Sequence, residues 1–159
     1  MLDMTHQGTL FFEDFEVGQV IETGSYKLEQ DEIIEFGRKY APVPYHTDPN
    51  AAKETSFGGL VAAGYQTAAV TFGLFARTGA LAESGMGSPG VDSLRWKHPV
   101  KAGDTLRVLA NILELSPAEK EGGRDAVRIR YDTLNQNDEI VMTLTSLHFV
   151  RRRPSTEDQ

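Results

Sequence analysis

The sequence predicts a single α+β domain, in which an antiparallel sheet wraps around one long central helix. Three observations carry this prediction. Residues 57–76 hold no charged side chain over 20 positions, four segments after residue 90 are strand-like, and a chain of 159 residues suits one core. With 40% hydrophobic and 25% charged residues, the composition is typical of a globular protein. We expect the domain to span residues 11–153, with flexible ends at 1–10 and 154–159.

The first expected elements are a strand over residues 19–28 and a helix over residues 31–40. In the helix, four large apolar side chains fall near one face, as an amphipathic helix requires. They are Ile33, Ile34, Phe36 and Tyr40. Residues 41–49 then contain three prolines, which exclude a regular helix there. Asp48 followed by Pro49 predicts the cap and first turn of a short helix.

The uncharged stretch is long enough to span a bilayer, so it allows two interpretations. It contains four polar side chains and four glycines, and it lacks a long run of Leu, Ile and Val. A helix that is apolar on every side is equally typical of a buried core helix. We therefore expect the central helix of a soluble domain without a membrane partner, ending near the glycines of residues 84–87.

After the helix, the hydrophobic period changes to two, which indicates strands. Four are expected, over residues 91–100, 105–115, 127–132 and 140–150. Turn-forming residues at 117–123 and 135–138 predict hairpins between the last three strands. A single sheet of this size cannot cover the central helix completely, so a second copy of the chain should close the remaining face. We expect a homodimer or a dimer of dimers.

Composition and charge exclude several classes of function. The net charge of −7 argues against nucleic-acid binding, which needs a basic surface. No cysteine is present, which excludes disulfides, thiolate catalysis and cysteine-based zinc sites and fits a cytoplasmic protein. Residues 1–16 lack the pattern of a signal peptide. The four histidines have no ligand-pair spacing, so no metal site is expected, and His148 should be a packed or hydrogen-bonded strand residue.

The segment with candidate chemistry is a proline-flanked loop that holds His46, ahead of the central helix. A histidine held in a rigid loop suits general acid/base work, because histidine titrates near neutral pH. Glycines at positions 58, 59 and 64 would let a ligand approach the backbone, and free N–H groups at the helix start could polarise a carbonyl. The residues alone leave a second interpretation open, in which His46 is a hydrogen-bonded turn residue and the glycines only permit tight turns.

This stretch resembles the hydratase motif of the MaoC-like dehydratases and (R)-specific enoyl-CoA hydratases, which have the hot-dog fold. The matching segments are Pro44-Tyr45-His46-Thr47-Asp48, Phe57-Gly58-Gly59 with Gly64, Gly90 through Trp96, and Pro99-Val100 through Gly103-Asp104-Thr105-Leu106. The resemblance covers about residues 10–153. It implies reversible addition of water to a 2-enoyl-CoA, as in fatty-acid metabolism. The partner is then an acyl-CoA or a related acyl-thioester, with no cofactor beyond the CoA of the substrate.

Carried over residue by residue, the resemblance implies that His46 is the catalytic acid/base and that the backbone N–H of Gly64 is the oxyanion donor. We expect the pocket to lie between the His46 loop and the start of the helix. Its candidate substrate-binding residues are Tyr45, Gly58, Gly59 and Tyr65.

One departure from the motif affects the chemistry. The family's aspartate, five residues before the histidine, is Ala41 in this sequence, and its Asn/Gln position is Val43. Alanine cannot accept a proton, and loss of a general acid/base costs about 10²–10⁴ in rate. Two functions remain as alternatives: an enoyl-thioester hydratase, and a non-catalytic or weakly active acyl-thioester binding or regulatory protein. A hot-dog thioesterase is disfavoured, because residues 57–82 hold no Asp or Glu for the central-helix acid that many of them use.

Overall fold

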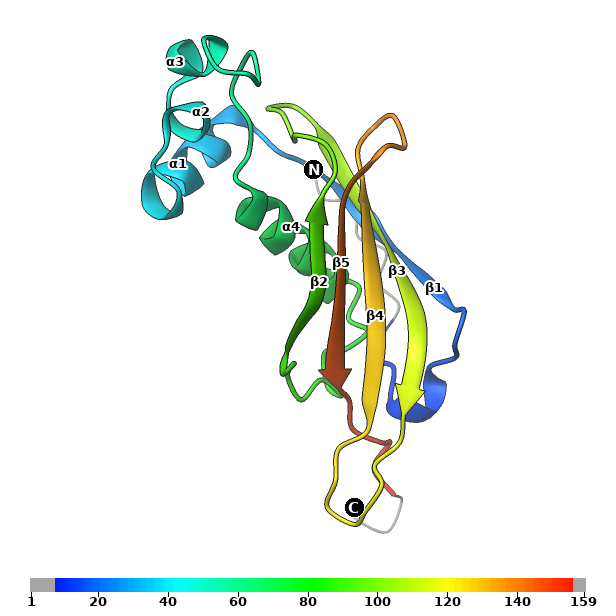
Figure 1. Ribbon diagram of the computed structural model, residues 1–159. Coiled ribbons are helices and arrows are strands. Elements are labelled where there is room, and N and C mark those ends of the chain that lie inside the picture. Colours follow the sequence, from blue (N-terminus) through cyan, green and yellow to red (C-terminus); the bar gives the residue numbers. More distant parts are fainter. Residues whose placement is uncertain (1–7, 156–159) are drawn as a thin grey trace.

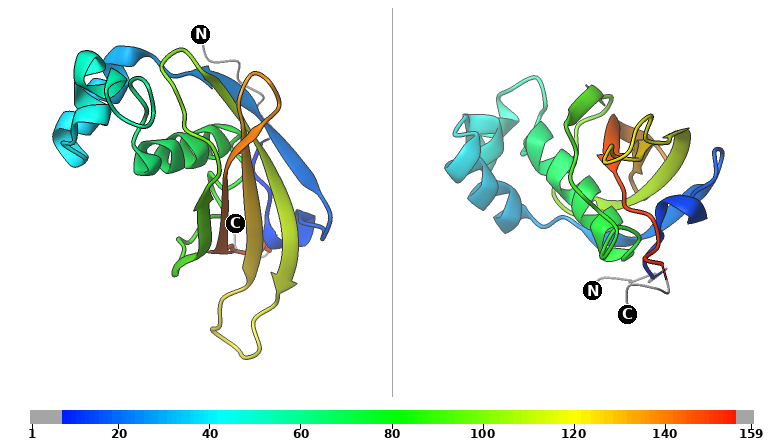
Figure 2. Two further views of the ribbon diagram at one scale, coloured as in Figure 1. Left: turned by 45° about the horizontal axis from the view of Figure 1, so that its top comes forward. Right: turned by 90° about the horizontal axis from the view of Figure 1, so that it is seen from below.

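The computed structural model describes residues 8–155 and shows one five-stranded antiparallel sheet curved around helix α4 (Figure 1, Figure 2). The strands are β1 (Val20–Lys27), β2 (Gly90–Trp96), β3 (Thr105–Ser116), β4 (Ala126–Leu134) and β5 (Ile140–Phe149). The helices are a 3₁₀ turn (Phe12–Asp14), α1 (Gln30–Tyr40), α2 (Pro44–Thr47), α3 (Pro49–Lys53) and α4 (Gly64–Arg77). The predicted α+β class, with an antiparallel sheet around a central helix, is confirmed.

The strand order across the sheet is β1-β3-β4-β5-β2. Hairpins join β3 to β4 and β4 to β5, as the turn-forming residues predicted. β2 instead lies at the far edge and pairs with β5, from Gly90 opposite Leu147 to Trp96 opposite Met142. Within residues 8–155, the outer edge of β2 has no partner strand, and its side chains are mostly exposed.

Helix α4 begins later than the uncharged stretch that predicts it, because the residues before Gly64 bond to a distant segment. Val61 forms an antiparallel bridge with Lys101, and the N–H of Ala62 donates to the carbonyl oxygen of Val100 at 2.8 Å. These backbone groups are therefore not available to a helix.

The helix also ends earlier than predicted, at Arg77 rather than near residues 84–87. Gly79 follows with a φ of +79°, a left-handed conformation that glycine adopts without strain and that stops a right-handed helix. The residues between this glycine and β2 include turns, with Ala80 and Ser84 buried and Gly85 in a bridge with Val150.

The loop after α1 contains one helical turn, α2, where the prolines predict no regular helix. Pro44 occupies the first position of this turn, where the missing N–H would have no partner in any case. Val43 before it is extended, as residues that precede proline usually are. The Thr47 hydroxyl donates to the Val43 carbonyl oxygen at 3.0 Å. The loop that carries His46 is thus stiffened by local bonds.

Helix α4 packs one face on the concave side of the sheet and leaves the other uncovered (Figure 2). Its buried side chains include Thr67, Leu74 and Phe75. On the uncovered face, Tyr65 is 72% exposed and Phe72 is 49% exposed. The prediction that one sheet cannot cover the helix is confirmed. Within the part of the chain that the structure describes, no helix combines the length and the apolar character needed to cross a membrane.

The sequence predicts a flexible N-terminus up to Leu10, but Leu10 itself is held in place. Its N–H donates to the carbonyl oxygen of Ala80 at 2.9 Å, and its own carbonyl accepts from the Ser84 hydroxyl at 2.6 Å. Residues 1–7 and 156–159 lie outside the described residues, so flexibility there stays a prediction.

The core beneath α4 contains a polar cluster on β4 and β5. Tyr131 is fully buried and packs edge-on against Phe75, with ring centroids 5.1 Å apart. Nε2 of His148 lies 2.8 Å from the Tyr131 hydroxyl and 2.9 Å from the Ser146 hydroxyl, so His148 is the hydrogen-bonded strand residue that the sequence predicts. Burial lowers the pKa of His148 from 6.5 to about 4 and raises the pKa of Tyr131.

Acidification should destabilise the protein through His148. The folded state keeps this ring neutral down to about pH 4, whereas the unfolded chain takes up the proton near pH 6.5. Above pH 6.5 the ring is neutral in both states, so its protonation does not lower the free energy of unfolding. Between pH 6.5 and pH 4 the unfolded state binds more protons, which favours unfolding. The free energy of unfolding therefore falls by about 1.4 kcal/mol per pH unit as the pH drops towards 4. Urea unfolding at a series of pH values measures the slope.

Two variants separate this effect from the titration of other groups. His148→Phe removes the buried imidazole and should flatten the slope below pH 6.5. His98→Phe removes an exposed imidazole and should leave the slope as in wild type. Equal slopes in all three proteins would contradict a neutral, buried His148.

Candidate active site

A cavity of about 570 Å³ opens at the start of α4. Its lining residues come from three segments: residues 41–46 in the loop after α1, Phe57 with residues 61–67 around the helix start, and residues 96–100 at and after the end of β2. Ligand sites commonly have volumes of about 300–1,000 Å³. The structure thus brings the His46 loop and the helix start together around a space of suitable size.

His46 lies in α2, with its ring buried in the wall of this cavity. Its Nδ1 is 2.7 Å from the carbonyl oxygen of Val61. Because a carbonyl can only accept, Nδ1 carries the proton, and the neutral ring then has an unprotonated Nε2. The N–H of Val61 donates in turn to the carbonyl oxygen of Tyr45 at 3.0 Å. These two hydrogen bonds hold the ring against the segment that leads into α4.

Helix α1 packs directly on the backbone of His46 at Gly37. A Cβ placed on Gly37 would lie 2.5 Å from the carbonyl oxygen of His46 and 3.0 Å from its Cβ, so no larger residue fits there without movement. Gly37 is not among the predicted site residues, although an isolated glycine inside a helix is a signal of close packing.

The first residues of α4 supply free backbone donors to the cavity. Ala63, at the N-cap, makes no side-chain hydrogen bond to the helix start. The N–H groups of Gly64 and Tyr65 have no acceptor within the helix, and among the described residues no backbone acceptor lies outside it. With the positive end of the helix dipole, these groups suit an oxygen that carries negative charge. Gly64 thus lines the cavity with an unpaired N–H, and its role as oxyanion donor stays a prediction.

Aromatic rings form much of the cavity wall. A side chain at position 64 would overlap with the indole of Trp96, so Gly64 also makes room for this ring. Tyr65 packs edge-on against Trp96 with ring centroids 5.5 Å apart, and Tyr45 contacts Phe57 at 5.1 Å. Tyr45 and Tyr65 lie in the wall, as expected from the sequence. Phe57 and Trp96 were not predicted as site residues, although both belong to the segments that carry the resemblance.

Gly58 and Gly59, predicted to bind substrate, do not line the cavity. Gly58 has a φ of +66°, which glycine adopts without strain. A Cβ added to either residue would meet no atom within 4 Å. In this structure the two glycines form the turn ahead of Leu60, and their role in substrate binding stays a prediction.

Ala41 and Val43 both line the cavity, at the positions where the resembling enzymes carry Asp and Asn or Gln. Among the described residues of the wall, five are titratable and none is a carboxylic acid. They are Tyr45, His46, Tyr65, Lys97 and His98. Asp48 caps α3 instead, as predicted, and accepts from the N–H of Asn50 at 2.9 Å and of Ala51 at 3.1 Å. Residues 8–155 contain no group of three or more His, Cys, Asp or Glu side chains that could hold a metal ion.

Gly37→Ala should destabilise the protein, because the added methyl group meets the His46 carbonyl. Helix propensity alone predicts the opposite sign, a gain of about 1 kcal/mol. Overpacking in a tight contact typically costs about 1–3 kcal/mol and should outweigh that gain. Urea unfolding gives the sign. Gly59→Ala is the control, since a Cβ there meets no atom within 4 Å. A Gly37→Ala protein more stable than wild type would contradict the contact.

Comparison with known proteins agrees with the resemblance in the sequence. Residues 14–133 match the family model described as the MaoC like domain. The uncharacterized protein YdeM of Bacillus subtilis is 28% identical over 126 residues, which cover 79% of this chain and 88% of YdeM. The crystal structure of the MaoC-like dehydratase from Rhodospirillum rubrum matches with a TM-score of 0.86 and 37% identity, covering 92% of this chain and 99% of that one. The unliganded (R)-hydratase PhaJ1 from Pseudomonas aeruginosa shares the fold, with a TM-score of 0.72 and 23% identity over 90% of this chain and 86% of that one. The chain belongs to the MaoC-like domain family and has the hot-dog fold.

Proposed function

We propose that the protein adds water reversibly to the double bond of a 2-enoyl thioester such as a 2-enoyl-CoA. One observation carries the proposal: His46, held by Val61 with Nε2 free, shares an apolar cavity with the unpaired N–H groups at the start of α4. Similarity to a MaoC-like dehydratase and to the fold of an (R)-hydratase supports this class of reaction.

In the proposed reaction His46 serves first as base and then as acid. Nε2 takes a proton from water while the water oxygen bonds to C3 of the enoyl chain. The electrons of the double bond move towards the thioester, whose oxygen gains negative charge. The N–H groups of Gly64 and Tyr65 stabilise this charge. Nε2 then returns the proton to C2, which completes the addition of water and restores neutral His46.

The cavity wall supports an acyl thioester as the substrate. The rings of Tyr45, Phe57, Tyr65 and Trp96 offer apolar surface to an acyl chain, and burial of such surface contributes about 25 cal/mol per Å². CoA enters as part of the substrate, so the proposal includes no separate cofactor. It also includes a cytoplasmic location, for which the cysteine-free composition is the support.

A second function, thioester binding without turnover, is favoured by Ala41 and Val43. Both are cavity residues, and no carboxylate among the described wall residues replaces the missing one. Loss of one general acid/base typically costs about 10²–10⁴ in rate. A protein with this cavity would bind the ester through the wall and the helix start, and would convert it slowly or not at all.

We also propose that two copies pair through the free edge of β2. Exposed edge strands are templates for pairing, and two-fold symmetry is the commonest solution among soluble oligomers. Exposed apolar side chains lie on the surface beside this edge: Val91 is 55% exposed and Trp96 48%, next to the uncovered Tyr65 and Phe72 of α4. A homodimer would cover this surface and would place each cavity at the subunit interface.

Light scattering should report a dimer, or a dimer of dimers, at micromolar concentration. Val91→Lys puts a charge on the β2 edge and should shift the protein towards monomer. Val17→Lys is the control, because Val17 is 63% exposed and lies outside β2 and α4. A monomeric wild type, or an unchanged mass for Val91→Lys, would overturn this assembly.

His46→Asn should abolish turnover and spare binding. The Asn amide can still donate to the Val61 carbonyl from the position of Nδ1, whereas Nε2 is lost. Loss of the enoyl-thioester absorbance of crotonyl-CoA measures turnover. Emission of Trp96 measures binding, since Trp96 lines the cavity and is the single tryptophan of the chain. We expect the rate to fall by about 10²-fold or more, with the binding titration unchanged.

The other outcomes separate the two functions. A change in Trp96 emission with no wild-type turnover would support thioester binding alone. Turnover that survives in His46→Asn would contradict the role of His46, and the absence of both signals would contradict a thioester site.

A further inference from the structure

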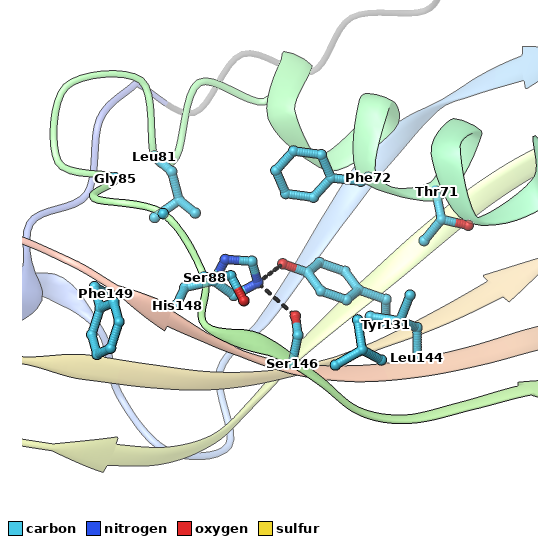
Figure 3. A pocket seen from close by; sticks show the side chains of 12 residues that line it. Thr71, Phe72, Leu81, Gly85, Ser88, Tyr131, Leu144, Ser146, His148 and Phe149 are labelled. Atoms are coloured by element: carbon cyan, nitrogen blue, oxygen red, sulfur yellow. Dashed lines mark hydrogen bonds between the residues drawn. The ribbon is translucent and has the colours of Figure 1, made fainter. Parts of the chain in front are cut away.

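A second cavity, of about 420 Å³, lies beside the C-terminal half of α4 (Figure 3). Its walls come from α4, from residues 81–91 that follow the helix, and from β4 and β5. Phe72 on the uncovered face of α4 stacks parallel to the ring of His148, with centroids 6.1 Å apart. The cavity therefore has a polar ring within a mainly apolar wall.

His148 carries the polar group that this cavity offers to a ligand. The residue is 6% exposed, and its Nε2 is occupied by the hydroxyls of Tyr131 and Ser146. Nδ1 is turned away from both hydroxyls, towards Leu81 (Figure 3). Among the described residues, the hydrogen bonds of this ring are those of Nε2, so Nδ1 has no protein partner.

The partners of Nε2 determine where the ring proton lies. A protonated Nε2 would leave the hydroxyl protons of Tyr131 and Ser146 without an acceptor in a buried site, which is costly. An unprotonated Nε2 shares its single lone pair between the two hydroxyl protons, and the ring proton then sits on Nδ1. Burial lowers the pKa of His148 to about 4, so the ring is neutral at physiological pH. Nδ1 is thus a neutral N–H donor.

The two cavities follow one another along α4. Thr67 lines the first cavity, and Thr71, one turn later on the same face, lines the second. On β2, Trp96 lines the first cavity and Val91 the second. Gly64, the proposed oxyanion donor, lies about 10 Å before Thr71 along the helix axis.

We propose that the acyl chain of the thioester extends along α4 into the second cavity, where Nδ1–H of His148 selects chains with a neutral hydrogen-bond acceptor near their far end. This inference rests on the proposed function and names its substrate class: acyl thioesters with a keto or similar oxygen about 10 Å from the thioester. A hydrocarbon chain would bury the Nδ1 donor unpaired. A carboxylate would lose its hydration beside a neutral ring, so a charged chain end is disfavoured.

The test compares decanoyl-CoA with 9-oxodecanoyl-CoA, which differ by one carbonyl group near the chain end. Both are saturated next to the thioester, so neither can be hydrated, and calorimetry reports binding alone. We expect 9-oxodecanoyl-CoA to bind wild type about fivefold more tightly, the usual worth of one additional hydrogen bond.

A combined variant removes the polar cluster without leaving a buried donor unpaired. In Tyr131→Phe/Ser146→Ala/His148→Leu, decanoyl-CoA should bind at least as tightly as to wild type, because no Nδ1 donor is then buried unpaired, and the preference for the ketone should disappear. Wild type alone provides a second measurement, which does not depend on the folding of the variant. The NMR signal of Nδ1–H of His148 should shift with 9-oxodecanoyl-CoA and not with decanoyl-CoA.

Three results would overturn this inference alone. Equal affinity of wild type for the two esters, or an unchanged preference in the combined variant, would remove His148 from substrate selection and leave the proposed hydratase site intact. Equal responses of the Nδ1–H signal to the two esters would do the same. If neither ester binds, the proposed function and this inference both fail.

Discussion

The backbone of Val61 holds the candidate site together. Its N–H donates to the carbonyl oxygen of Tyr45 at 3.0 Å, and its carbonyl accepts the Nδ1–H of His46 at 2.7 Å. Both bonds join the loop after α1 to the residues that lead into α4. On its other side Val61 bridges Lys101, in the connection between β2 and β3. Val61 and its neighbour Ala62, whose N–H donates to Val100, therefore align the three segments of the cavity, and they do so through backbone groups that every residue except proline supplies.

This arrangement has a direct chemical consequence. The bond to Val61 reserves Nδ1 of His46 and leaves Nε2 for a substrate, while the start of α4 supplies unpaired N–H groups. The position where resembling enzymes place a carboxylate is occupied by Ala41, which is also in the cavity wall. The site thus combines a positioned base and a positioned oxyanion donor, and lacks the second acid/base group. Binding depends on the wall and the helix start, whereas turnover depends on His46 alone.

Hydrophobic periodicity predicts most of the fold. A strand with one buried face has apolar residues at alternate positions, and a helix that packs on a sheet has one stripe of apolar residues. Two features depend on distant pairing and have no local signal. α4 starts at Gly64 because Val61 and its neighbour bond to the β2–β3 connection, and β2 lies at the sheet edge beside β5. The residues of the candidate site also fall into those that the sequence predicts and those that it does not. The spacing of the motif predicts His46 and the helix start, whereas the packing of Gly37 on His46 and the place of Trp96 in the cavity wall depend on tertiary contacts that spacing does not encode.

Ala41 decides whether the cavity is a complete hydratase site. The most direct measurement is crotonyl-CoA turnover by wild type, by Ala41→Asp and by Ala41→Asp/His46→Asn. We expect slow turnover in wild type, because Ala41 removes one acid/base group. Ala41→Asp should raise the rate by about tenfold or more, given the usual worth of one acid/base group, and the gain should vanish in the double variant. Brisk wild-type turnover that Ala41→Asp leaves unchanged or lowers would contradict this, because a different group would then have to activate the water.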